Sequence, residues 1–137
     1  MTTKILVDLE RCVGCWTCSM ACKVGNCLDE DDFRINVVTH GSGAGIDRPQ
    51  GVYPNLRMSW QPVFAKSCTF CPERLAEGEL PYCAHNCPTK AIAIGDDADA
   101  SGGFCQAVER VQALHYNLFE SPDYADERAN VVYASRE

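Results

Sequence analysis

Four cysteines fall within eleven residues near the start of the chain, in "CVGCWTCSMAC" at positions 12 to 22. They follow one another at steps of three, three and four. A second stretch, "CTFCPERLAEGELPYCAHNCP", carries four more cysteines and ends on Pro88. The two groups are Cys12, Cys15, Cys18 and Cys22, then Cys68, Cys71, Cys83 and Cys87. Thiolates are ligands of zinc and of iron–sulfur clusters, so both groups indicate metal chemistry.

Zinc is one alternative for this pattern, because a zinc ribbon binds its metal through two C-x2-C knuckles. A tetrahedral zinc ion, however, has no use for a third cysteine three residues further along the same turn. A [4Fe–4S] cube offers iron corners on several sides, and a loop around it can present a thiolate at every third residue. The spacing therefore favours two [4Fe–4S] clusters, and a zinc-binding interaction module is the less favoured alternative.

The bacterial C-x2-C-x2-C-x3-C-P run sends its fourth cysteine to the other of two clusters. The same exchange in this sequence gives two complete ligand sets, which we name cluster A and cluster B. Cluster A takes Cys12, Cys15, Cys18 and Cys87. Cluster B takes Cys22, Cys68, Cys71 and Cys83. With four cysteines on each cluster no iron is left open for a substrate, so we expect electron transfer and no catalytic residue.

The composition of the sequence excludes several classes of function and partner. Twelve Lys and Arg against 19 Asp and Glu give a formal net charge of −7, which lacks the basic footprint of a nucleic-acid partner. There is no apolar run long enough for a signal peptide or a direct membrane span, so a cytoplasmic location is the default expectation. In a reducing cytosol, ten cysteines in 137 residues indicate metal or redox chemistry more than disulfides.

Two cysteines remain outside the eight ligands, and we expect Cys27 and Cys105 to be small buried hydrophobic residues. His85 lies between two ligands in "CAHNC" and either donates a hydrogen bond to a cluster sulfur or faces water; His40 and His115 share no spacing with it. Three cations lie close to ligands in the sequence, where a positive charge would raise a cluster's potential; the alternative is an ordinary solvated side chain. They are Lys66, Arg74 and Lys90.

The elements that position the ligands can be predicted coarsely. The alternating run "KILVDL" predicts a strand at 4–9 that leads into the first cysteine group, and "AIAIG" predicts a strand at 91–95 after the second. Short helices are expected at 16–24 and 84–90. Between the cysteine groups, two stretches rich in strand formers flank "GSGAGIDRPQG" and predict a β-hairpin-like insertion.

The C-terminal part predicts a helix and a final extended segment. In "FCQAVERVQALHYNLF", apolar residues recur at helical spacing and are expected to face the core. They are Phe104, Val108, Val111, Leu114 and Leu118. The closing "ANVVYAS" is expected to form a last strand or an extended arm.

Taken together, these stretches resemble a shortened iron–sulfur subunit of the dimethyl sulfoxide reductase family of molybdenum and tungsten enzymes. The resemblance covers "CVGCWTCSMACKVGNCL", "GVYPN" and "CTFCPERLAEGELPYCAHNCPTKAI", and more weakly "ANVVYAS". In the last cysteine group it includes Arg74, Gly78, Pro81, Pro88, Thr89, Ala91 and Ile92. The usual subunit has two further cysteine groups between the first and the last, and residues 28–67 of this sequence hold none of the cysteines that would supply them.

The resemblance implies one α+β domain over 1–137, with a two-cluster ferredoxin-like fold of the bacterial type. Residues 28–67 would be the inserted hairpin, and 96–137 a C-terminal extension of a helix and an extended arm. It also implies electron transfer to or from a large molybdopterin-containing catalytic subunit, which in the relatives lies nearest the cluster that corresponds to cluster A. An external electron donor or acceptor would then dock near cluster B.

A free two-cluster ferredoxin is the main alternative function. Such ferredoxins are usually much shorter, and the extra surface of the insertion and the C-terminal extension is better suited to holding a permanent partner. Relatives can also be exported folded on a partner that carries a signal peptide, which qualifies the cytoplasmic expectation.

Overall fold

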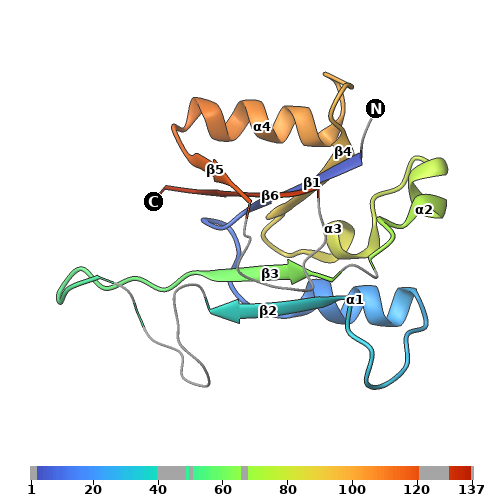
Figure 1. Cartoon of the computed structure of the whole chain (residues 1–137), viewed down its shortest axis with the longest axis horizontal. Helices are drawn as coiled ribbons and strands as arrows, with labels where there is room; N and C mark the ends of the chain where they lie inside the picture. Colours follow the sequence, from blue (N-terminus) through green and yellow to red (C-terminus); the bar gives the residue numbers. More distant parts are fainter. Residues whose placement is uncertain (1–2, 40–48, 50, 66–67, 121–129, 137) are drawn as a thin grey trace.

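The computed structural model describes residues 3–39, 49, 51–65, 68–120 and 130–136 (Figure 1). Its elements, in chain order, are β1 (Thr3–Asp8), α1 (Thr17–Gly25), β2 (Ile35–Thr39), β3 (Trp60–Phe64), α2 (Pro72–Ala76), α3 (Tyr82–Asn86), β4 (Ile92–Asp96), α4 (Gly103–Ala113), β5 (Asn117–Phe119) and β6 (Val131–Ser135). None of these helices is both long and apolar enough to cross a membrane. Strands and helices in this mixture make the domain an α+β unit.

The larger sheet has the strand order β4-β1-β6-β5. Its central strand β1 pairs antiparallel with β4 and parallel with β6, and β5 pairs antiparallel with β6. Successive residues of a strand point to opposite faces, and β1 is buried on both. Leu6 packs with residues of α4, while Ile5 and Val7 pack with the cysteines on the other face.

Figure 1 shows the resulting layers, with α4 over one face of the larger sheet and α1, α3 and the β2–β3 pair on the opposite side. β2 and β3 form a separate antiparallel sheet, in which Ile35 pairs with Phe64. The Tyr133 hydroxyl of β6 donates a buried hydrogen bond of 2.8 Å to the Pro62 carbonyl of β3. This bond links the two sheets across the core.

The structure agrees with most of the expected elements near the cysteines. β1 and β4 lie within one residue at each end of the expected strands, and α1 within one residue of the expected helix. The helix expected at 84–90 is shorter and ends at Asn86. Cys87 precedes Pro88, and a residue before proline is driven out of the helical region; its φ of −67° and ψ of 118° are extended.

The helix expected over 104–119 is too long, and this prediction is wrong in its second half. α4 ends at Ala113, after which His115 adopts a left-handed φ of 61°. The His115 and Tyr116 amides donate to the Gln112 and Val111 carbonyls, which is the Schellman pattern that terminates helices. The chain then forms β5, so Leu114 and Leu118, expected in the core, are 53% and 38% exposed.

The closing segment forms strand β6 inside the larger sheet and makes no extended arm over the described residues 130–136. Tyr133 and Ala134 have no solvent exposure at all. The final strand is therefore part of the core that supports the cysteine loops.

Candidate metal centre

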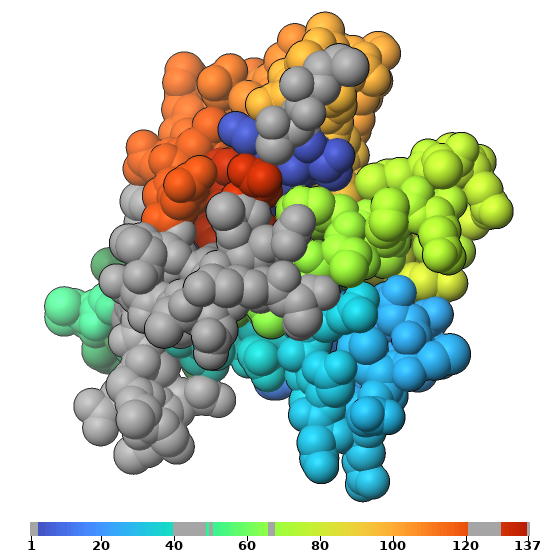
Figure 2. Space-filling view, turned by 45° about the vertical axis from the view of Figure 1, so that its right-hand side comes forward, coloured from blue at the N-terminus to red at the C-terminus, as the bar shows by residue number. Residues whose placement is uncertain are grey.

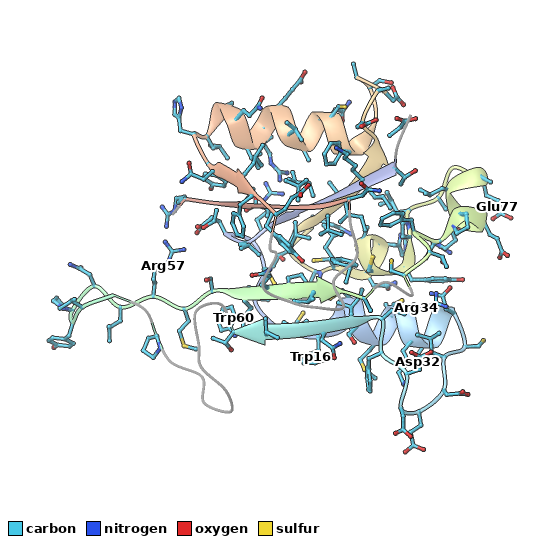
Figure 3. All side chains as sticks on the ribbon, viewed as in Figure 1. Trp16, Asp32, Arg34, Arg57, Trp60 and Glu77 are labelled. Atoms are coloured by element: carbon cyan, nitrogen blue, oxygen red, sulfur yellow. The ribbon has the colours of Figure 1, made fainter. Side chains whose placement is uncertain are left out.

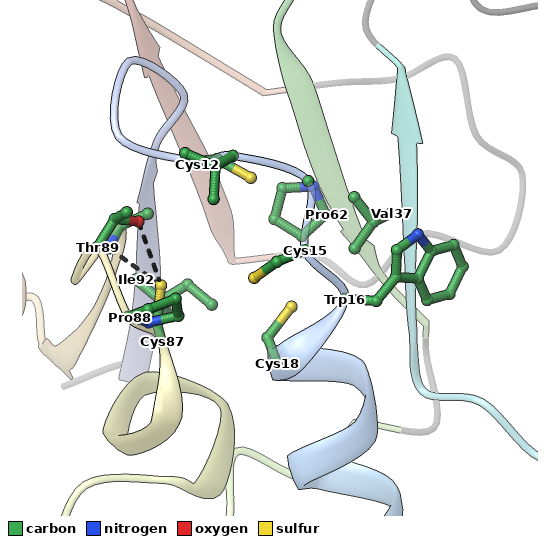
Figure 4. A pocket seen from close by; sticks show the side chains of 13 residues that line it. Cys12, Cys15, Trp16, Cys18, Val37, Pro62, Cys87, Pro88, Thr89 and Ile92 are labelled. Atoms are coloured by element: carbon green, nitrogen blue, oxygen red, sulfur yellow. Dashed lines mark hydrogen bonds between the residues drawn. The ribbon is translucent and has the colours of Figure 1, made fainter.

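The cysteines expected around cluster A lie around one pocket. Cys12 and Cys15 come from the loop between β1 and α1, Cys18 from the first turn of α1, and Cys87 from the end of α3. Figure 4 shows the first three facing Cys87 across the open space. Residues far apart in the sequence thus present four thiols to a common volume.

The remaining walls of this pocket are mostly apolar. Val37, Pro62 and Ile92 close its sides. Thr89 adds a hydroxyl group to the lining. A pocket that combines four thiols with hydrocarbon fits a compact cofactor held by thiolates alone, as an iron–sulfur cube is. Among the described residues, no three His, Cys, Asp or Glu side chains are close enough together to hold a single metal ion.

Burial and hydrogen bonds give the thiols around this pocket different pKa values. The exposed Cys15 thiol donates to the Thr17 hydroxyl at 3.2 Å, and hydrogen bonding with Thr17 lowers the Cys15 pKa. Burial instead raises the pKa of Cys18 to about 12. Cys87 accepts a hydrogen bond of 3.3 Å from the Ala91 amide. Cys15 is therefore more readily ionised for metal capture than Cys12 or Cys18, whose pKa values burial raises, and thiolates are the ligands.

The cysteines expected around cluster B also lie together. Burial is the first cause of the raised pKa of Cys83, and negative charge at the other cluster B thiols, and at Cys18, raises it further. Burial, followed by charge at Cys68 and Cys71, does the same for Cys22. The Asn26 amide lies 3.5 Å from the Cys22 sulfur and 4.0 Å from the Cys71 sulfur, and so bridges two of the four.

The two sets are linked through a pair of helices. Cys18 and Cys22 are four residues apart on α1 and share one helical face, while Cys83 lies on α3 and Cys87 directly follows the end of α3. Cys18 shares a pocket with Cys87, whereas Cys22 lies with Cys83, so α1 and α3 run in opposite directions. α1, and α3 together with the residue that follows it, each contribute one thiol to each set.

Both cysteine loops contain residues with a left-handed backbone conformation. Gly14 and Trp16 have φ of 69° and 64° just before α1, and Phe70 and Cys71 have 63° and 49° just before α2. L-residues other than glycine adopt this conformation rarely, so its use at both loops indicates that the surrounding structure imposes it. Both loops reach their helices through the same kind of turn.

The exposed fraction differs between the sets. Cys15 of set A is exposed, while three thiols of set B are buried and Cys71 is half-buried. Cys71 opens into a second, polar pocket with Asn26, Arg74 and Tyr82 among its walls. The neighbouring α2 segment projects from the side of the molecule, between α1 and α4 in Figure 2.

Other residues singled out from the sequence have different surroundings. The His85 side chain is exposed, and its carbonyl accepts a hydrogen bond of 3.0 Å from Lys90. Arg74 is paired with Glu79 at 3.1 Å and lies 4.4 Å over the Tyr82 ring. Both cations are thus engaged in local contacts; Lys66 and His40 lie outside the described residues.

The expectation for the two remaining cysteines is wrong for Cys27, which is exposed. It follows the end of α1 and has a left-handed φ of 53°, at the start of the acidic loop on the surface. Cys105 is half-buried on α4, with its thiol 3.4 Å from the Asp97 carbonyl. Neither residue lines the cluster A pocket.

Spacing rules did not identify the polar groups around the sulfurs. Asn26 and Thr17 are recognisable only once the loops are folded, and the Ala91 contact is a backbone amide that no side-chain pattern reveals. For Asn26 the resemblance of the first cysteine group was the one available signal.

Comparison with known proteins adds an independent finding. Residues 5–26 match the family described as 4Fe–4S binding domain. The sequence is 33% identical over 99 residues to a candidate dimethyl sulfoxide reductase iron–sulfur protein of Halobacterium salinarum, covering 68% of this chain and 34% of that protein. It is 29% identical over 92 residues to the arsenate respiratory reductase iron–sulfur subunit ArrB of a Shewanella species, covering 67% and 32%.

A component of the anaerobic dimethyl sulfoxide reductase of Escherichia coli is 26% identical over 114 residues, with 82% of this chain and 42% of that protein covered. The matched part thus spans about a third of the length of the first two relatives. The 4Fe–4S family match contains the first cysteine group. This chain is an iron–sulfur protein related to the iron–sulfur subunits of the dimethyl sulfoxide reductase family of molybdopterin oxidoreductases.

Proposed function

We propose that this chain is a non-catalytic electron-transfer subunit that holds two [4Fe–4S] clusters in the ligand sets A and B. The fold would be that of a bacterial two-cluster ferredoxin with β2–β3 as an inserted hairpin. The observation that carries the proposal is the antiparallel pair α1 and α3, because α1, and α3 with the Cys87 that follows it, each have one thiol in each set. Such an arrangement places two redox centres side by side, as a relay needs.

Bound clusters would supply one-electron redox chemistry. The chain would hold them through eight thiolates and limit water with Val37, Pro62 and Ile92 at cluster A. Donors to sulfur stabilise a reduced cluster, and the Asn26 amide at set B and the Ala91 amide at set A would do so. None of these groups has to gain or lose a proton for an electron to pass.

We propose that the large molybdopterin-containing catalytic subunit docks over cluster A. Exposed Cys15 lies there among exposed apolar residues, with Val13 52%, Trp16 40% and Met20 47% accessible. A central apolar patch of this kind suits a lasting subunit contact. The external electron donor or acceptor would approach cluster B through Cys71 and its polar pocket. The cytoplasm is the proposed location, with export on a signal-bearing partner as the variant.

Iron and sulfide analysis tests the cluster content. Protein purified anaerobically from iron-replete cells should hold about eight iron and eight sulfide, because two cubes need four of each. Its absorption spectrum should show the broad visible bands of cubane clusters, and these should fade on reduction by dithionite. Stoichiometric zinc without sulfide would contradict the proposal and support a zinc-binding module.

Native size separates a subunit from a free ferredoxin. In gel filtration of an extract, followed by immunoblotting, a subunit elutes in a complex well above its own 15.1 kDa. Elution of all the protein near that mass would support the free ferredoxin.

A further inference from the structure

Arg34 is held beside cluster B by the backbone on both of its sides. It directly precedes β2, and its carbonyl accepts a hydrogen bond of 2.7 Å from the Ala65 amide. Ala65 in turn accepts one of 3.0 Å from the Cys68 amide. The adjacent Ile35 carbonyl accepts a bond of 2.7 Å from the Ser19 hydroxyl, one helical turn before Cys22 on α1. Arg34 thus lies between the segments that carry two cluster B ligands.

The guanidinium of Arg34 is half-buried, and its Nε atom is buried with no hydrogen-bond partner among the described residues. Buried donors nearly always have an acceptor, and an arginine stays charged in proteins. Figure 3 shows Arg34 beside α1, where the chain passes into β2. A buried cationic donor at this place calls for an acidic or sulfur acceptor nearby.

Arg34 lies within electrostatic reach of the Cys22 thiol, and it is the cationic side chain that acts on this ligand. The bond from the Ala65 amide to Arg34 and the bond from Ser19 to the adjacent Ile35 hold the residue at this place. Arg74 differs, since Glu79 pairs with it and its Nε donates to the Leu80 carbonyl at 2.6 Å.

We propose that Arg34 is a positioning residue that stabilises the reduced form of cluster B, through its charge and its buried Nε–H between the segments that carry Cys22 and Cys68. The inference rests on the proposed function and goes beyond it, because it names the side chain that sets the order of the two clusters in redox potential. Reduction adds one electron from the external donor and neither makes nor breaks a bond.

A redox titration followed by electron paramagnetic resonance tests the proposal on anaerobically purified protein. The signal of cluster B is identified by its change in a Cys83→Ser variant. Arg34→Gln should lower the fraction of reduced cluster B about tenfold at fixed potential, a shift of about 59 mV to more negative values for a one-electron couple. The potential of cluster A should change much less. Arg110→Gln is the matched control, because the Arg110 Nε is also buried without a hydrogen-bond partner among the described residues but lies on α4, across the larger sheet from the cysteines; it should leave both potentials near those of the natural chain.

Arg34→Lys keeps the charge but loses the planar Nε–H, so it should shift cluster B in the same direction by a smaller amount. If the Arg34→Gln protein does not bind cluster B, the Arg34→Lys protein is used to test the proposal, provided that it still contains eight iron atoms. An unchanged potential of cluster B, or an equal shift of both clusters, overturns the proposal. Absence of eight iron and eight sulfide from the natural chain would instead overturn the proposed function.

Discussion

At the scale of the residue, the eight cysteines are chemically unequal although the sequence writes them alike. Hydrogen bonding with Thr17 lowers the pKa of Cys15, whereas burial raises that of Cys18, three residues later, to about 12. Binding of a metal cluster releases the protons of its ligand thiols. The buried thiols, whose pKa is raised, therefore become thiolates only when the cluster binds. Spacing identifies the ligands, but only the fold determines which of them ionises readily.

Gly14 provides a test of how closely the first cysteine loop fits its surroundings. It lines the cluster A pocket with a φ of +69°, and a Cβ there would lie 2.6 Å from the Trp60 ring. Gly14→Ala should therefore cost the left-handed strain of about 1–2 kcal/mol and displace the indole as well. We expect reduced iron content and a weakened cluster A signal, measured by iron analysis and paramagnetic resonance.

Gly78→Ala is the matched control for this substitution. Gly78 has a similar φ of +79°, but a Cβ there would have no heavy atom within 4 Å. It should show the backbone strain alone, as a small drop in the temperature of cluster loss with both clusters present. Equal effects of the two alanines on cluster A would show that contact with Trp60 is unimportant.

At the scale of the element, local patterns predicted the parts of the fold that local chemistry determines. The alternating residues of β1 and the proline after Cys87 act over a few residues, and the structure follows them closely. The apolar period that runs to Leu118 is equally regular. It fails because His115 takes a left-handed conformation that ends α4, and a polar residue at that position gives no strong sequence signal.

The pairing of β6 was beyond any local pattern. Its parallel partner β1 lies at the other end of the chain, with Ile5 beside Val131, and sequence periodicity carries no information on such distant neighbours. For the same reason Arg34 was not among the expected cations, although Arg74 and Lys90, expected from sequence proximity, are engaged elsewhere.

Tyr133→Phe tests whether the link between the two sheets supports the fold. The substitution removes the 2.8 Å bond to the Pro62 carbonyl and leaves that buried acceptor unpaired, which should cost about 1–3 kcal/mol. The temperature at which the cluster absorbance is lost should fall by several degrees. Tyr53→Phe, at a side chain 83% exposed, should leave it unchanged. A similar loss in both variants would argue against a structural role for this bond.

At the scale of the whole molecule, the two ligand sets predict different consequences when one is broken. Cys83→Ser should perturb cluster B and slow exchange with the external partner, while the catalytic cofactor and cluster A still equilibrate. Cys87→Ser should instead disconnect the catalytic subunit. Rapid-mixing reduction of the isolated complex, followed at both centres, distinguishes the two. A structure of the complex with cluster B nearer the catalytic cofactor would reverse the assignment.

The fold without metal should be weak and sensitive to alkali. Ligation and folding are coupled, so we expect the cluster-free chain to be largely unfolded. Burial raises the pKa of Cys18 from 9.0 to about 12 and also raises those of Cys12, Cys22 and Cys83. Above pH 9.0 the folded form holds protons that the unfolded form gives up, so this contribution is fully present below pH 9.0 and is lost progressively as the pH rises toward about 12.

Circular dichroism of the cluster-free chain should therefore show any residual structure decreasing as the pH rises from 9.0 toward about 12. The clustered protein is the control, because its ligands are already thiolates and should not respond over this range. A cooperative thermal transition that survives cluster removal, or one that strengthens with rising pH, would contradict this account.

The central place of β6 sets an order of events during synthesis. Cys87 leaves the ribosome before Ser135, by roughly 2–10 s at about 5–20 residues per second. Through that interval all eight ligands exist, while the edge of β1 that will receive β6 has no partner. Open strand edges invite pairing with other chains. The nascent protein thus has a short period in which early cluster delivery would stabilise a half-built sheet, and late delivery would leave it exposed to aggregation.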